Sequence, residues 1–119
     1  MKSLTEKEEI IMNFFWEKGE MTVREMLELY PEPKPHFNTT STQIRMLEER
    51  GFVAHHDLGA RCYKYYAAIS RQEYDKQTLG NVIEKHFNSS YLGAVSCLVE
   101  EEKITLDELK ELIRMVEGK

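Results

Sequence analysis

Short polar side chains and one arginine share a single face of a helical stretch between residues 38 and 50. On a wheel of 3.6 residues per turn, this face carries Asn38, Thr39, Thr42 and Arg45, with Met46 beside them. Amide, hydroxyl and guanidinium groups donate hydrogen bonds to phosphates and to base edges in the major groove of DNA. The predicted chemistry is therefore noncovalent recognition of duplex DNA, in which Ser41 of the same helix also takes part.

An apolar face on the opposite side of this stretch is expected to fix how the polar face is presented. Thr40, Ile44 and Leu47 lie there together with Gly51, at a spacing typical of a helix packed on a core. Asn38 is a suitable N-cap, and Gly51 suits the left-handed position after the last turn. The stretch thus predicts a short helix with its polar side turned outward.

Two β-rich runs, residues 52–56 and 61–66, follow this helix around a turn that contains glycine. This spacing predicts a hairpin, and a recognition helix followed directly by a hairpin is the winged form of the helix-turn-helix. Arg61 and Lys64 on the hairpin are expected to bind the flanking phosphate backbone. The alternative for these cations and for Arg45 is that they are simply solvated.

Two further helices are predicted before the recognition helix, and each begins with a capping box. Thr5 with Glu8 opens the first helix, and Thr22 with Glu25 opens the second. Between them Met21 is expected to add a very short third strand to the hairpin. The segment between the second and third helices carries three prolines, which end the second helix.

After residue 69 the pattern changes to three helices. Capping boxes are predicted to open the first, at Ser70 with Glu73, and the third, at Thr105 with Glu108, and Ser90 is expected to cap the second. The apolar side chains of these helices are too few to close a core alone, so we expect them to pack against a second copy of the chain. The chain is thus predicted to be mainly α with a small β-hairpin. A winged helix-turn-helix DNA-binding domain over residues 1–69 would precede a helical dimerisation domain over residues 70–119. The residues expected at the dimer interface are Leu79, Val82, Ile83, Phe87, Leu92, Val95, Leu98, Leu109, Leu112 and Ile113.

The net charge of −5 over 119 residues is unfavourable for binding a polyanion. Between residues 34 and 64 the balance is reversed, with five basic residues (Lys34, Arg45, Arg50, Arg61, Lys64) against three acidic ones (Glu48, Glu49, Asp57). Because this excess is small, one protomer is expected to bind DNA weakly. A dimer would bring two recognition helices to sites about 34 Å apart, one turn of the duplex.

Other function classes find little support in the sequence. No apolar run approaches the roughly 20 residues of a membrane span, and no apolar signal core is present at the N-terminus. A cytoplasmic protein with two reduced thiols, Cys62 and Cys97, is therefore expected. His55 and His56 are neighbours in a predicted strand, so they point to opposite faces and are unsuited to one metal ion. The sequence shows neither a glycine-rich phosphate-binding loop nor a paired nucleophile and base, so we expect neither an enzyme nor a cofactor.

The order of these features resembles the penicillinase-repressor family of transcriptional regulators, the BlaI/MecI type with its copper-responsive CopY branch. The likeness covers nearly the whole chain. The matching residues are Leu4 to Glu8, Ile11, Met12, Phe15, Trp16, Thr22 to Glu25, Thr39 to Thr42, Ile44, Leu47, Arg50 to Val53, Tyr63 to Tyr66 and Leu98 to Leu112. This resemblance implies a winged-helix homodimer that binds a palindromic operator and represses transcription.

Three departures from the family pattern limit what the resemblance implies. Some members are cleaved at an Asn-Phe pair through a membrane sensor-protease pathway, but the matching positions here are Cys97 and Leu98. A membrane sensor-protease therefore stays open as a partner of this chain, but cleavage of the chain at Cys97 and Leu98 is not predicted. The copper branch carries closely spaced C-terminal cysteines that this chain lacks, so metal sensing of that kind is not expected. Ser41 stands where members often have a basic or amide residue, so the operator sequence is expected to differ.

Two other functions stay open at the level of sequence. A winged-helix protein–protein interaction module is favoured by the net negative charge and opposed by the threonine-rich helix face and the basic hairpin. The other is a DNA-binding activator or ligand-responsive regulator of another winged-helix family.

Overall fold

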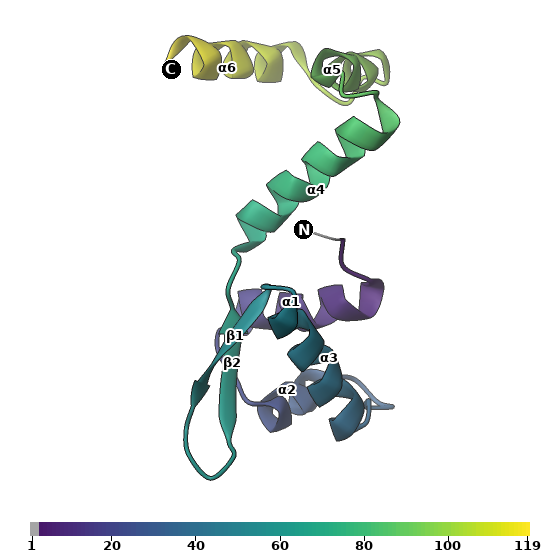
Figure 1. Ribbon diagram of the computed structural model, residues 1–119. Coiled ribbons are helices and arrows are strands. Elements are labelled where there is room, and N and C mark those ends of the chain that lie inside the picture. The colour runs from purple at the N-terminus through teal and green to yellow at the C-terminus, as the bar shows by residue number, and fades with distance from the viewer. Residues whose placement is uncertain (1–2) are drawn as a thin grey trace. The chain divides into compact units, whose positions relative to one another are not determined.

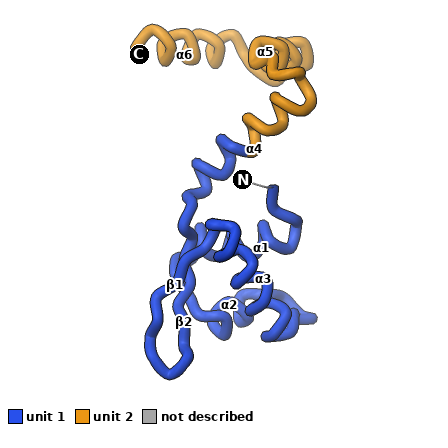
Figure 2. The backbone as a smooth tube through the Cα atoms, in the orientation of Figure 1, with its two compact units in different colours: residues 1–77 blue, residues 78–119 orange. Residues whose placement is uncertain are grey.

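The computed structural model describes residues 3–119, which form six helices and one two-stranded sheet (Figure 1). The chain divides into two compact units, one that runs to Gln77 and one that begins at Thr78 (Figure 2). The predicted fold class is confirmed, because a winged helix forms the N-terminal part and helices alone form the C-terminal part.

The first unit holds the helix-turn-helix and its wing. Its helices are α1 (Glu6–Lys18), α2 (Val23–Leu29) and α3 (Phe37–Glu49), followed by strands β1 (Val53–Asp57) and β2 (Tyr63–Ala67). The third helix, which the sequence analysis identified as the recognition helix, packs against α1, α2 and β1. The wing therefore begins directly after α3 and packs against it.

The hairpin is antiparallel, in a register that places Val53 opposite Ala67 and Asp57 opposite Tyr63. The expected third edge is confirmed, since Met21 and Tyr65 exchange two backbone hydrogen bonds of 2.9 and 2.8 Å. Gly51, at φ +87°, occupies the predicted left-handed position between α3 and β1. These features anchor the base of the wing to the helices.

The core of the first unit is built from all of these elements. On α3 the three predicted inward residues, Thr40, Ile44 and Leu47, are fully buried. Met12, expected beside the apolar stripe of α1, is also fully buried. The other core members are Leu4, Ile11, Phe15, Met21, Val23, Met26, Phe52, Val53, Tyr65, Ile69 and Tyr74.

Capping boxes open three of the four helices for which the sequence predicts one, at Thr5, Thr22 and Thr105. At Ser70 only half of the predicted box forms among the described residues, because the Ser70 hydroxyl accepts a 3.1 Å hydrogen bond from the Glu73 N–H without the reciprocal bond. The predicted N-cap of α3 is wrong. The cap and the first helical residue each lie two positions earlier than an Asn38 cap requires, so His36 is the N-cap and Asn38 is the second helical residue; among the described residues no side chain caps this helix. In the first turn of α3, the Phe37 ring lies against α2, with the Arg24 guanidinium 5.3 Å from its centroid.

The helix α4 (Arg71–His86) begins in the first unit and ends in the second. Its first turns belong to the core of the first unit, where Tyr74 lies 5.7 Å from the ring of Trp16 and 6.0 Å from that of Phe52. The division of function at residues 69 and 70 stays a prediction, since the boundary between compact units describes packing alone.

The second unit continues with α5 (Tyr91–Glu100) and α6 (Leu106–Glu117). Ser90 caps α5 by accepting a 2.9 Å hydrogen bond from the Gly93 N–H. No residue of either helix is buried within the part of the chain that the structure describes. Among residues 3–119, no helix combines the length and apolar character that crossing a bilayer requires.

Candidate nucleic-acid interface

The polar face of α3 is turned away from the core, as predicted. Because Thr40, Ile44 and Leu47 are fully buried on the other side, the rotation of the helix about its axis is set by packing. The predicted DNA-binding residues on α3 are therefore exposed, apart from Ser41, which is half-buried; the exposed ones are Asn38, Thr39, Thr42, Arg45 and Met46.

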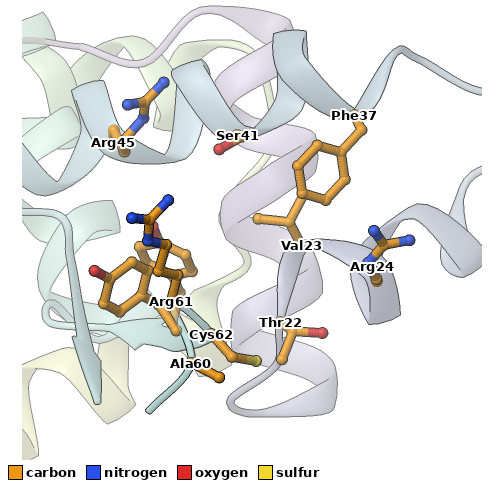
Figure 3. Close-up of a pocket in the computed structure, with 11 residues that line it drawn as sticks. Thr22, Val23, Arg24, Phe37, Ser41, Arg45, Ala60, Arg61 and Cys62 are labelled. Carbon is orange, nitrogen blue, oxygen red and sulfur yellow. The ribbon is translucent and has the colours of Figure 1, made fainter. Parts of the chain in front are cut away.

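A groove of about 500 Å³ separates this helix from the wing and from the start of α2 (Figure 3). The side chains that line it are Thr22, Val23, Arg24, Phe37, Ser41, Arg45, Ala60, Arg61, Cys62, Tyr63 and Tyr65. Three of these eleven residues are arginines and none is acidic, among the residues that the structure describes. In a chain with a net charge of −5, positive charge is thus concentrated at one concave surface.

Two of the three arginines are ones that the sequence predicts. Arg45 and Arg61 both line the groove, on its left side in Figure 3, although they come from α3 and from the wing. The Arg45 Nη2 donates a 3.3 Å hydrogen bond to the Thr42 hydroxyl one turn earlier, which orients the guanidinium. Ser41 completes the set of predicted residues that the fold brings to the groove.

Arg61 is presented by an unusual backbone at the tip of the wing. Ala60 and Arg61 have φ of 51° and 59°, a left-handed conformation that costs non-glycine residues free energy. The turn is held by the carboxylate of Asp57, which accepts a 2.8 Å hydrogen bond from the Gly59 N–H, and by a Cys62 N–H bond of 2.9 Å to the Gly59 carbonyl. This compact turn places Arg61 on the side of the wing that faces α3.

The third arginine, Arg24, was missed by the sequence analysis. It lies on α2 beside Phe37 at the other end of the groove (Figure 3). It follows the capping Thr22 and the buried Val23, so its place in the sequence marks it only as a residue of the first turn of α2. Sequence alone therefore contains no local signal for it, because the groove forms only when α2 packs beside α3.

Lys64, by contrast, does not line the groove. It is half-buried on β2 next to Tyr65, and neighbouring strand residues point to opposite sides of a sheet. Its charge lies near Glu25, whose pKa is lowered first by the Thr22 backbone and side-chain hydrogen bonds and to a lesser degree by Lys64. The contact between Lys64 and the DNA backbone stays a prediction, and it would lie outside the groove.

The two histidines of the wing each face a carboxylate. His55 Nδ1 contacts the Glu48 carboxylate, and His56 Nε2 lies 3.6 Å from that of Glu20. Their ring contacts confirm that they occupy opposite faces, since His55 packs on Tyr63 and Tyr65 whereas His56 stacks on Tyr66. Within residues 3–119, no group of three or more histidine, cysteine or acidic side chains is arranged to hold a metal ion.

Tyr65 forms the floor between the groove and the core. It is buried, whereas Tyr63 two residues earlier is 38% exposed. Burial raises the pKa of the Tyr65 hydroxyl, with a further contribution from the Glu48 carboxylate, so this phenol stays protonated at neutral pH. The groove is therefore lined by neutral and cationic groups.

A second, apolar surface lies within the second unit. Seven residues predicted at the dimer interface are 39–78% exposed there, namely Leu79, Val82, Leu92, Val95, Leu98, Leu112 and Ile113. Phe87 and Leu109 are half-buried. Ile83 is buried within the chain, at 7% exposure, so it supports this surface from beneath and does not line it. A hollow of about 620 Å³ runs over the surface between α5 and α6.

Comparison with known proteins places this geometry in context. A family model described as Penicillinase repressor matches residues 4–118 of the chain. The chain is also similar to the methicillin resistance regulatory protein MecI of Staphylococcus aureus strain N315, with 24% identity over 110 residues that cover 92% of this chain and 89% of the relative. The protein of the same name from Staphylococcus epidermidis matches with the same identity and coverage.

Proposed function

The chain belongs to the penicillinase repressor family of transcriptional repressors, and on this premise we propose that it binds a palindromic operator as a homodimer. In each protomer α3 would enter the major groove. The wing would lie over the adjacent backbone. Occupation of the operator would then block transcription of the genes that it controls.

The observation that carries this proposal is the segregation of charge at the groove. Three arginines and no acidic side chain line it, among the residues described, in a chain of net charge −5. Arginine forks match the oxygen pairs of phosphates and of guanine edges. The first turn of α3 contains no acidic residue either, so its N–H groups favour a nearby phosphate.

In the proposed complex, different side chains of α3 contact different parts of the DNA. Arg45 would contact a guanine edge or a phosphate, and Thr39 and Thr42 would contact a phosphate or a thymine methyl group. Arg61 on the wing would bind the flanking backbone. Each good base contact contributes about 1–3 kcal/mol of discrimination between sequences.

The homodimer is proposed from the apolar surface of the second unit. Leu92, Ile113 and Val116 are 78%, 55% and 73% exposed, which is unfavourable for a surface left in water. A second copy of the chain would cover this surface and would supply the second recognition helix that a palindrome needs. Doubling the number of phosphate contacts would also offset the small positive charge of one protomer.

A winged-helix protein-interaction module is the alternative, and the net charge of −5 favours it. Salt dependence distinguishes the two, because DNA binding releases counterions and weakens steeply with salt. We would titrate the protein into labelled duplex from its own upstream intergenic region, beside a scrambled duplex, and follow fluorescence anisotropy between 50 and 200 mM salt.

The expected result is specific binding at two protomers per site, with an affinity that falls by orders of magnitude across this range. Arg45→Ala should weaken binding to the specific duplex by about ten-fold or more while the protein stays dimeric. Equally poor binding of both duplexes at low salt would refute the proposal and favour the interaction module.

A further inference from the structure

Arg24 is a solvent-exposed cation on the groove with no acidic partner among the described residues. Its guanidinium lies 5.3 Å from the centroid of the Phe37 ring, within the range of a cation–π contact. Phe37 itself is 40% exposed, although it is the first residue of α3. The ring therefore contacts the guanidinium without neutralising its charge, which stays available to an anion in the groove.

We propose that Arg24, held by Phe37, is a further DNA-binding residue, and that the groove holds one strand of the phosphodiester backbone between α3 and the wing. This inference rests on the proposed function and names what occupies the groove. It adds α2 to the interface, which the sequence analysis confined to α3 and the wing.

The arrangement of the three arginines supports a backbone strand as the occupant. Arg45 and Arg61 lie at one end of the groove and Arg24 at the other (Figure 3), so cations flank the space on both sides. If α3 enters the major groove of DNA and the wing contacts the duplex beside that groove, the DNA backbone between these two contacts must cross the space between α3 and the wing. This backbone carries one negative charge at each phosphate. The hydroxyls of Ser41 and Thr22, which also line the groove, can donate hydrogen bonds to its oxygens.

The Phe37 ring gives Arg24 a defined position. A free arginine side chain loses rotamer entropy when it is immobilised. Contact with the ring restricts the guanidinium before DNA arrives, so less of this entropy is lost on binding. Lysine would keep the charge but lacks the planar group that stacks on a ring.

The test measures the salt dependence of binding for the full chain and for Arg24→Gln. Each phosphate contact contributes about 0.9 to the slope of log affinity against log salt concentration. Arg24→Gln should lower the slope by about this amount for each protomer. It should also weaken the specific and the scrambled duplex by the same factor, because the backbone is common to both.

Arg71→Gln is the matched control. Arg71 also lies over an aromatic ring, 5.9 Å from that of Trp16, but it does not line the groove. Its removal should leave the slope unchanged. Arg24→Lys should keep the slope and lose about two- to five-fold in affinity, and Phe37→Leu should cause a similar loss that does not add to that of Arg24→Gln.

Several outcomes would overturn the inference. An Arg24→Gln variant that folds, as judged by circular dichroism, and keeps the slope of the unmodified protein would exclude Arg24 from the interface. An unchanged affinity in Phe37→Leu would remove the ring from the argument. Failure of the unmodified protein to bind duplex DNA with any salt dependence would instead refute the proposed function itself, and the inference with it.

Discussion

Arg50 joins the C-terminal end of α3 to the N-terminal segment, and its removal should destabilise the unit that presents the recognition helix. The Nη1 atom lies 2.7 Å from the Glu8 carboxylate, and Nη2 donates a 3.0 Å hydrogen bond to the Ser3 carbonyl. The guanidinium also covers the Phe52 ring at 5.1 Å. We predict that Arg50→Met lowers the free energy of unfolding of the first unit.

The size of this effect follows from the burial of the pair. The side chains of Arg50 and Glu8 are 28% and 13% exposed, between a surface pair and a buried one. Surface pairs contribute 0.2–1 kcal/mol, and removing one partner of a buried pair costs about 3–5 kcal/mol. An intermediate loss of about 2 kcal/mol is therefore expected, which corresponds to about 1–2 M in the urea midpoint of a small domain.

The pH dependence gives this prediction a second, independent test. Burial raises the pKa of Glu8, but hydrogen bonds from the Thr5 N–H and from Arg50 outweigh it and hold the pKa below its ordinary value of 4.5. A lowered folded-state pKa stabilises the protein above the unfolded value and loses this effect as the pH falls through the folded one. The difference between the unmodified protein and Arg50→Met should thus be full at pH 7 and shrink below pH 4.5.

Urea unfolding followed by tryptophan fluorescence suits the assay, because Trp16 lies at the edge of this core. Arg114→Met is the matched control, since its pair with Glu111 is 65% and 63% exposed and should contribute less than about 0.5 kcal/mol. A double-mutant cycle with Glu8→Gln should give a coupling of about 1–2 kcal/mol at neutral pH. Equal effects of the two arginine substitutions, or a coupling near zero, would refute the reasoning.

Three further predictions concern the core, a turn and the dimer. Thr40→Val should raise the free energy of unfolding by about 1 kcal/mol, because the fully buried Thr40 hydroxyl has no hydrogen-bond partner among the described residues; a lower melting temperature would contradict this. Gly51→Ala should lower the free energy of unfolding by about 1 kcal/mol or more, since φ is +87° at Gly51. Gly80→Ala, within α4, is the control and should be neutral or stabilising in the same urea titration. Ile113→Asp should convert the proposed dimer to monomers in sedimentation velocity without unfolding the protomer, because the side chain is already 55% exposed; a dimer that persists at micromolar concentration would place the interface elsewhere.

Much of the fold was predictable because it depends on interactions within a few residues. The capping boxes at Thr5, Thr22 and Thr105 each join residues three apart, so the sequence shows both partners. The inward face of α3 followed from helical spacing, and the left-handed Gly51 from its place after the last turn. The error at Asn38 lies at the start of α3, where among the described residues no side chain caps the helix and Arg24 of α2 contacts Phe37.

The candidate site depended on longer distances along the chain. The sequence by itself determined that α3 has a polar outer face and that a hairpin with cations follows it, since both result from residue periodicity. Only the tertiary structure decided that Arg24 joins Arg45 and Arg61 at one groove and that Lys64 does not. The physical reason is that these arginines come from three separate elements, whose relative placement is set by the shared core beneath them and by no pattern within any one of them.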